Sequence, residues 1–403
     1  MEMVEHRMRQ LSRWQYIALF PVACLCVTTL WLLANTEFKM GFPRAIFKSV
    51  PPAQVVGEET SSAGSSPSHE KTSSQYQHPF LNQKCYIYEN LRARFTCTDS
   101  THRFINYSFD DILKCFTNLS EAIRNKSINN YWKNPGSSYR KRSAKNAVEI
   151  SERPIVHLAM VGDSHIRGIF ERFMRRISND RILVEKVRMT KKEVNKYLRK
   201  SLKWVKERPN HCLEMDHLDV PLRVVFYWDK YLQRLPHLLS SWMNGSATKP
   251  THLLLGSTLH YVVAVEDILY VKGIKVATRP FYNHLKVISP LLKTFSRSAQ
   301  VVFKLQDHLE RYSRYVFDDM LLLDYYNKIA SDLLVPRSPS FVVWNSTIPL
   351  SDLYEKECSR NGSRLPRKNK KKCSNEMHLG IMALDRFLDM YLNDICSFEN
   401  KSL

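Results

Sequence analysis

A serine directly after an apolar run is the feature of this chain best suited to covalent chemistry. Gly162, Asp163, Ser164 and His165 follow the run 155–161. Apolar residues then recur at helical spacing, at Ile166, Ile169, Phe170, Phe173, Met174 and Ile177. This pattern predicts a strand-to-helix turn that exposes the Ser164 hydroxyl beside the first helical amides. Hydrolases and acyltransferases use such a turn to stabilise an oxyanion. The alternative interpretation is that these four residues form a tight turn without a catalytic role.

A nucleophilic serine needs a general base. The chain has 14 histidines, and His378 is distinguished by its position in the loop 373–379, which leads into the last helical pattern. We therefore predict that His378 takes the proton of Ser164. The alternative interpretation is an ordinary polar residue at the start of a helix.

Donors for the oxyanion are predicted at the end of another apolar run. Gly256 closes the run 252–256 and is followed by Ser257 and Thr258. The amide of Gly256, with that of Thr258 or Ser257, is expected to act together with the amide of Ser164. A simple strand-terminating turn is the alternative.

The elements that must position these residues alternate along the chain from residue 153. Apolar runs lie at 155–161, 182–187, 222–228, 252–256, 300–305 and 340–344. Helical patterns lie at 191–206, 283–297 and 318–334, and a last one runs from Ile381 to Ile395. Strands that alternate with helices predict an α/β fold with a mostly parallel sheet flanked by helices on both faces. The site is then expected at the carboxyl ends of the strands.

The N-terminal region predicts a membrane anchor. Residues 14–34 carry no charge and are long enough to cross a bilayer. We interpret them as an uncleaved signal anchor after a cytosolic tail, 1–13, with a cleavable signal peptide as the competing interpretation. Residues 35–78 are predicted to be a stem, because the part from about residue 50 is rich in Ser, Pro and Thr and poor in large apolar groups.

Sequons and cysteines favour a lumenal location for the rest of the chain. All seven N-x-S/T triplets follow the apolar segment. They begin at Asn106, Asn118, Asn125, Asn244, Asn345, Asn361 and Asn400. Seven cysteines also follow it, so in an oxidising lumen most should pair, with one left over. Cys358 with Cys373 is the predicted local pair. Residues 79–150 are predicted to be a disulfide-tied N-terminal portion of the lumenal region, and residues 151–403 its α/β domain. No C-x-x-C pair indicates a structural metal.

The net charge of +21 leaves two interpretations open. One is an acidic partner, such as a polyanionic glycan, a nucleic acid or an anionic surface. The other is a basic, solvated protein surface. Aromatic residues are not interleaved with the basic clusters as they are in nucleic-acid platforms, so no nucleic-acid partner is expected.

The order of these motifs resembles the SGNH/GDSL hydrolase clan. Within the clan, residues 153–396 resemble the PC-esterase group and the lumenal domain of the sialate O-acetyltransferases. Four segments carry this resemblance: Gly162 to His165, 224–228, 255–258 and the histidine loop 373–379. The resemblance implies that Ser164 is the nucleophile and that a D-x-x-H element supplies an aspartate and a histidine.

Two departures from that family matter. The D-x-x-H element is Asn375, Glu376, Met377 and His378 here, so an asparagine replaces the aspartate that orients the histidine. The multi-span acyltransferase region of the sialate O-acetyltransferases has no counterpart in these 403 residues. The resemblance therefore implies the fold and the site more securely than it implies turnover.

Together these features predict a single-pass type II Golgi membrane protein whose lumenal domain acts on O-acetyl esters of glycans. No bound cofactor or metal is expected. A transferase would need an acyl donor such as acetyl-CoA and, as a partner, an acyl-donor transporter. The main alternative is a catalytically degenerate fold that binds glycans or assists another enzyme. A glycosyltransferase is a third hypothesis, which the lack of a D-x-D motif disfavours.

Overall fold

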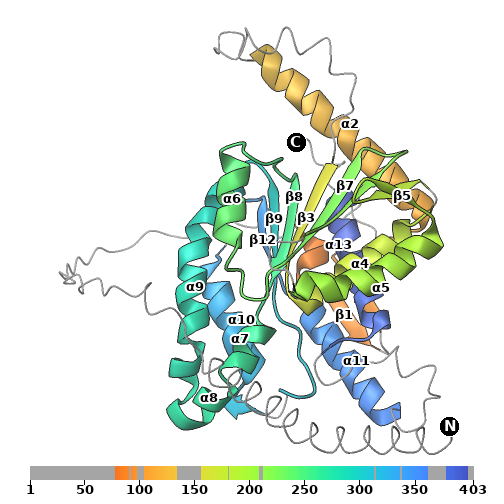
Figure 1. Ribbon diagram of the computed structural model, residues 1–403. Coiled ribbons are helices and arrows are strands. Elements are labelled where there is room, and N and C mark those ends of the chain that lie inside the picture. The colour runs from red at the N-terminus through yellow and green to blue at the C-terminus, as the bar shows by residue number, and fades with distance from the viewer. Residues whose placement is uncertain are drawn as a thin grey trace, which may run out of the picture. The chain divides into compact units, whose positions relative to one another are not determined.

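Among the residues that the structure describes, eight strands form the central sheet, in the order β12-β9-β8-β3-β7-β6-β4-β5 (Figure 1). The strands from β12 to β7 pair in parallel. They are β3 (Val156–Gly162), β7 (Leu222–Trp228), β8 (His252–Gly256), β9 (Gln300–Lys304) and β12 (Phe341–Trp344). Most of their residues are buried, as parallel strands covered on both faces require. The predicted α/β fold with a mostly parallel sheet is confirmed.

The computed structural model describes residues 78–89, 92–97, 104–133, 156–179, 181–207, 212–312, 315–335, 338–361 and 378–397. All of them belong to the unit Glu70–Leu403. The predicted anchor 14–34 lies outside these residues. Within them, no helix has the length and hydropathy needed to cross a membrane.

One half of the sheet departs from the prediction. The run 182–187 is not one strand but the start of a hairpin, β4 (Ile182–Val184) and β5 (Val187–Met189), because Glu185 and Lys186 take positive φ angles of 49° and 66° and turn the chain. Strand β6 (Cys212–His217) was missed, since its charged residues break the apolar run. It lies antiparallel between β7 and β4 and buries every second side chain.

Helices cover both faces of the sheet. In Figure 1, α6 (Leu235–Met243), α9 (Ile274–Phe295) and α10 (Leu322–Leu333) lie on one side, and α4 (Ser164–Ile177), α5 (Lys191–Glu207) and α13 (Ile381–Cys396) on the other. The remaining helices of the α/β region are α7 (Leu259–Ala264), α8 (Glu266–Lys272) and α11 (Thr347–Asn361). The helices predicted from 191 and 381 are found with nearly those bounds.

Two predicted helices have different starts. Helix α9 begins at Ile274 rather than 283, because its buried residues continue the pattern upstream and Pro280 and Pro290 are accommodated inside it. Helix α10 begins at Leu322 rather than 318. The preceding residues form a hairpin, β10 (Val316–Phe317) and β11 (Met320–Leu321), around Asp318 and Asp319 at positive φ.

The N-terminal portion shares the core of the sheet. It contains η3 (Pro79–Leu81), η4 (Gln83–Cys85), β1 (Tyr86–Glu89), β2 (Arg92–Phe95) and α2 (Phe109–Lys133). Leu81, Ile112 and Phe116 are fully buried in the same cluster as the strands. His78, the last residue of the predicted stem, is buried, and its Nδ1 lies 2.9 Å from Asp394 Oδ1. The rest of that stem, residues 35–77, lies outside the described residues.

Two disulfides are formed by described residues. Cys85 pairs with Cys97, and Cys115 of α2 pairs with Cys396 at the end of α13. The second bond closes 281 residues and ties the N-terminal portion to the last helix. Cys212 is a free thiol. Cys373 lies outside the described residues, so its pairing with Cys358 stays a prediction.

Candidate active site

The turn after β3 is fixed by two close backbone approaches. A Cβ atom on Gly162 would lie 2.2 Å from the carbonyl oxygen of Gly256, and one on Gly256 would lie 2.7 Å from the carbonyl oxygen of Lys304. Both distances are far below van der Waals contact, so only glycine fits at either position. The chain can therefore leave β3 close to the neighbouring strands and enter α4 at the carboxyl edge of the sheet.

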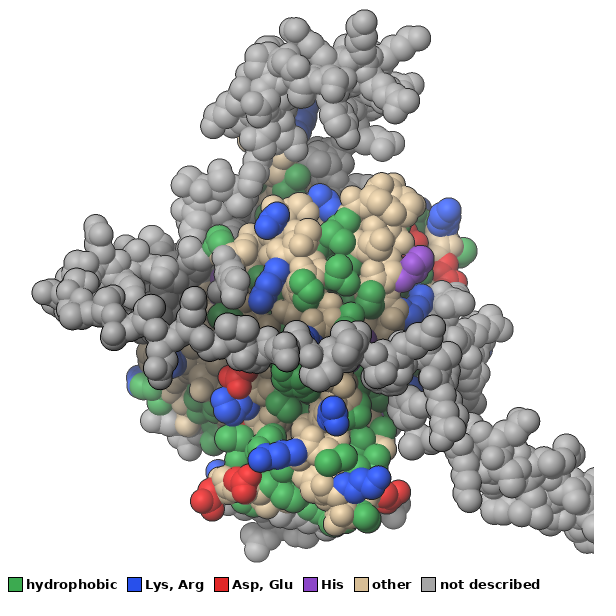
Figure 2. All heavy atoms as spheres, turned by 90° about the vertical axis from the view of Figure 1, so that its left-hand side faces the viewer, with side chains coloured by type: hydrophobic (Ala, Val, Ile, Leu, Met, Phe, Trp, Pro, Cys, Tyr) green, Lys and Arg blue, Asp and Glu red, His purple; other side chains and the backbone are tan. Residues whose placement is uncertain are grey.

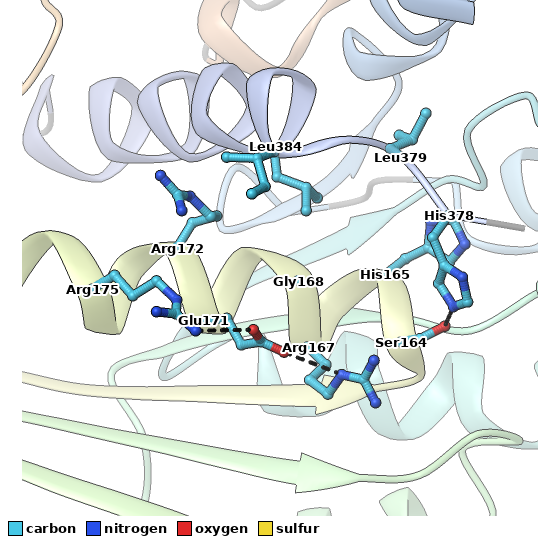
Figure 3. Close-up of a pocket in the computed structure, with 11 residues that line it drawn as sticks. Ser164, His165, Arg167, Gly168, Glu171, Arg172, Arg175, His378, Leu379 and Leu384 are labelled. Carbon is cyan, nitrogen blue, oxygen red and sulfur yellow. Dashed lines mark hydrogen bonds and ion pairs between the residues drawn. The ribbon is translucent and has the colours of Figure 1, made fainter. Parts of the chain in front are cut away.

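Ser164 is the first residue of α4 and lies against His378. Asp163 caps the helix, since its Oδ1 accepts a hydrogen bond from the amide of His165 at 2.9 Å. The amide of Ser164 precedes the first intrahelical bond and has no carbonyl partner within the helix. Ser164 Oγ lies 3.0 Å from His378 Nε2 (Figure 3). Residues 214 positions apart are thus brought within hydrogen-bonding distance, because the start of α13 packs across α4.

Among the described residues, the structure does not bring the other predicted site residues into hydrogen-bonding contact with Ser164 and His378. Gly256 is the register partner of Gly162 in the sheet. Thr258 is buried, and its carbonyl accepts hydrogen bonds from two amides of α7. Neither residue lines the cavity beside Ser164, so their role in an oxyanion hole stays a prediction. Asn375 and Glu376 lie outside the described residues.

Asp352 and Asp385, two other carboxylates in this part of the sequence, have hydrogen-bond partners other than His378. Asp385 accepts two hydrogen bonds from Arg172, at 2.6 and 2.7 Å. Asp352 Oδ1 lies 2.7 Å from Nδ1 of His308. We therefore do not assign either aspartate to orient His378. In the family motif an aspartate at position 375 has that role.

A buried polar group next to the Ser164 turn was missed by the sequence analysis. Asp307 is 1 % exposed, and its Oδ2 lies 2.6 Å from Lys304 Nζ and 3.7 Å from His165 Nδ1. Burial raises the pKa of Asp307, but Lys304 and His165 outweigh it and lower the pKa to about 2. The ring of His165 in turn stacks on that of His378, with centroids 5.9 Å apart. The sequence contained a signal for this pair, because Lys304 and Asp307 lie at the carboxyl end of a predicted parallel strand, where functional residues are expected.

The Lys304–Asp307 pair yields a stability prediction. Lys304→Met is expected to destabilise the fold by about 3–5 kcal/mol, because it leaves the Asp307 carboxylate buried without its cation. The double variant Lys304→Met, Asp307→Leu should recover most of that loss. Urea unfolding of the three proteins measures both effects. Equal destabilisation in the single and the double variant would show that the charge pair is not the cause.

A cavity of about 350 Å³ opens beside Ser164, between α4 and the start of α13 (Figure 3). It is lined by Ser164, His165, Arg167, Gly168, Glu171, Arg172, Arg175, His378, Leu379, Ile381 and Leu384. Glu171 lies 3.5 Å from Arg167 and 3.9 Å from Arg175. One carboxylate thus serves two guanidinium groups, which leaves the cavity net positive. The opposite wall is apolar, so the cavity suits a ligand with an anionic group and a small apolar group.

A second group of titratable side chains lies after β9. His308 is held between Asp324, at 2.8 Å, and Asp352. Burial lowers the pKa of His308, but the hydrogen bonds and charges of the two aspartates outweigh it and raise the pKa to about 10. Burial, assisted by Asp352, raises the pKa of Glu355 to about 8.

This cluster predicts how stability depends on pH. A histidine whose pKa is raised by folding stabilises the fold fully below about pH 6.5, and this contribution is lost as the pH rises through about 10. The raised pKa of Glu355 acts in the same direction. We expect the free energy of unfolding to fall over this range and His308→Gln to flatten the fall. An identical slope in His308→Gln, measured by urea unfolding, would assign the dependence to other groups.

Comparisons with known proteins add no relative. No protein-family model matches the chain, and no curated protein matches it significantly. The resemblance to SGNH hydrolases therefore rests on the residues themselves. Within the described part of the chain, no three His, Cys, Asp or Glu side chains are grouped so that they could hold a metal ion.

Proposed function

We propose that this protein is an acyl-ester enzyme of the Golgi lumen that transfers an O-acetyl group to a glycan hydroxyl or removes it. The observation that carries the proposal is the 3.0 Å contact between Ser164 Oγ and His378 Nε2 at the start of a helix. A serine activated by a histidine, next to free helical amides, is the arrangement that acyl transfer needs.

The proposed reaction has two steps. His378 takes the proton of Ser164 while Oγ attacks the acyl carbonyl, and the amide of Ser164 donates to the oxyanion that forms. The imidazolium then gives its proton to the departing oxygen, which leaves an acetyl ester on Ser164. In the second step His378 deprotonates water or a sugar hydroxyl, which attacks this ester. Ser164 Oγ then leaves and recovers the proton. Water gives an esterase and a sugar hydroxyl gives a transferase.

The cavity supports an acidic glycan as the substrate. Arg167 and Arg175, which share the single carboxylate of Glu171, supply planar donors for a carboxylate or sulfate. Leu379 and Leu384 offer apolar contact for an acyl methyl group. The test is mass spectrometry of cell-surface glycans from cells that express the parent protein or Ser164→Ala. The proposal expects their O-acetyl content to differ, and equal content would contradict it.

A glycan-binding or accessory protein without catalysis is the second candidate. Asn375 favours it, because an asparagine cannot supply the negative charge that stabilises a protonated histidine. The engagement of Asp352 and Asp385 with other partners favours it too. The retained Ser164–His378 contact favours the enzyme.

The lumenal location yields a prediction about N-glycans. Asn125 and Asn244 are exposed, whereas Asn345 accepts a hydrogen bond from the amide of Gln83 and Thr347 of its sequon is fully buried. We expect glycosidase digestion to lower the apparent mass, and peptide mapping to find glycans at Asn125 and Asn244 but not at Asn345. A mobility that does not change would contradict the lumenal location.

Other sequons are less decisive. Asn106 is exposed and accepts a hydrogen bond from Arg386 at 2.5 Å. Asn118 is half-buried on α2. Asn361 is the last residue of α11, and Asn400 lies outside the described residues.

A further inference from the structure

A second cavity, of about 260 Å³, lies between the edge strand β5 and helix α5. Its charged lining consists of Arg188, Lys196 and Lys200, together with Glu193. Val187 and Met189 contribute apolar contact. The tight turn at 185–186 directs β5 back along the edge of the sheet beside α5, which creates the hollow.

This part of the molecule is strongly basic. Residues 185–200 contain seven Lys or Arg and two Glu. Both carboxylates are occupied by local hydrogen bonds. Glu193 accepts from the amide and the hydroxyl of Thr190, each at 2.8 Å, and so caps α5. Glu185 accepts from the hydroxyl of Tyr197 at 2.5 Å. With seven cations against two carboxylates, the segment 185–200 is net positive.

The two cavities lie near each other, because helix α4 lines the first and contacts helix α5, which lines the second. Ser164, Arg167, Glu171 and Arg175 lie on one face of α4, at i, i+3, i+7 and i+11, over about 16 Å of helix. At the far end Arg175 donates a hydrogen bond to Asn195 of α5, and the next residue, Lys196, lines the second cavity. Figure 1 shows α4 and α5 side by side. A track with a net positive charge thus leads from Ser164, past Arg167 and Arg175, which share the carboxylate of Glu171, to the cations of the second cavity.

We infer that this track binds an extended polyanionic glycan, with the cavity between β5 and α5 as an anchoring subsite for its sulfate or carboxylate groups. The inference rests on the proposed function in one respect, since it makes the reacting sugar one unit of a longer acidic chain. A glycan is favoured over a nucleic acid, because Tyr197 is the one aromatic side chain among the described residues that line the cavity and its hydroxyl holds Glu185.

The test is the affinity of the full-length protein for heparin, with an unsulfated polysaccharide as the reference. The variant Arg188→Gln, Lys196→Gln, Lys200→Gln is expected to bind heparin about tenfold more weakly at low salt. The matched control is Lys275→Gln, Arg279→Gln, Lys286→Gln on α9, which removes the same charge. Helix α9 lies on the face shown in Figure 2, where Lys and Arg side chains are scattered among hydrophobic ones. The control should bind within about twofold of the parent.

The outcomes separate this inference from the proposed function. An equal loss of heparin affinity in both variants would show that net charge alone causes the effect, and would overturn the inference. Unchanged heparin affinity in both variants would overturn it too. Tighter binding of single-stranded RNA than of heparin, lost in the variant at Arg188, Lys196 and Lys200, would overturn the assignment to a glycan. Fluorophosphonate labelling of that triple variant reports on Ser164 alone, because none of its substitutions lies in the cavity beside Ser164. Loss of heparin affinity with normal labelling supports the anchoring subsite, whereas a parent protein that binds heparin but does not label contradicts the proposed function alone.

Discussion

Replacing Ser164 by alanine is expected to abolish covalent labelling of the protein by a fluorophosphonate probe. The probe reacts with a serine whose hydroxyl is deprotonated by a neighbouring base, and His378 Nε2 is 3.0 Å from Ser164 Oγ. His378→Ala should slow labelling by about a thousandfold or more. The melting temperature should change little in Ser164→Ala, because one hydroxyl hydrogen bond contributes about 1 kcal/mol.

The serine that caps the C-terminal end of the same helix supplies the control. Ser178 is buried at the end of α4, and its hydroxyl donates to the carbonyl of Met174 rather than to a histidine. Ser178→Ala should label at the rate of the parent. Unchanged labelling in Ser164→Ala would place the reactive residue elsewhere, and a parent protein that does not label would support the binding protein over the enzyme.

Restoring an aspartate at position 375 is expected to raise esterase activity towards a simple acetyl ester by about tenfold or more. A carboxylate beside the catalytic histidine fixes its tautomer and stabilises the imidazolium, and in serine proteases its replacement by asparagine costs roughly 10⁴-fold in kcat. Asparagine presents either an oxygen or an NH₂ group to the ring and carries no charge. The measurement is kcat/KM for the parent and for Asn375→Asp.

Glu376→Gln is the companion variant for this prediction. A fast parent enzyme, unaffected by Asn375→Asp and crippled by Glu376→Gln, would show that Glu376 orients His378. If Asn375→Asp, Glu376→Gln and His378→Ala all leave activity unchanged, the proposed Ser164–His378 mechanism is wrong.

The turn at Ser164 could be predicted because its signals are local. An apolar run, a glycine and a helical pattern follow each other within 23 residues, from 155 to 177, and the structure forms that strand, turn and helix. His378 could be selected from the sequence only by its position in the loop before the last helix and by the resemblance to the SGNH hydrolases. The contact itself depends on how α13 packs across α4, which local patterns do not contain.

Other features depend on distant partners and were missed. The strand β6 has alternating charged residues, and only its place between β7 and β4 makes it a strand. Asp307 follows the end of a predicted strand, but its pairing with Lys304 and its approach to His165 depend on how the chain buries it. The bond between Cys115 and Cys396 joins residues 281 positions apart, a pairing that spacing alone cannot select.

The most direct test of the central claim is to trap the acyl-enzyme. The parent protein and His378→Ala are mixed with an acetyl ester, quenched in acid and digested, and the peptide that carries residue 164 is examined by mass spectrometry. The proposed mechanism predicts an acetyl group on Ser164 in the parent and its absence in His378→Ala. Hydrolysis or transfer of acetate with Ser164 unmodified, or an acetyl group found only on another residue, would contradict it.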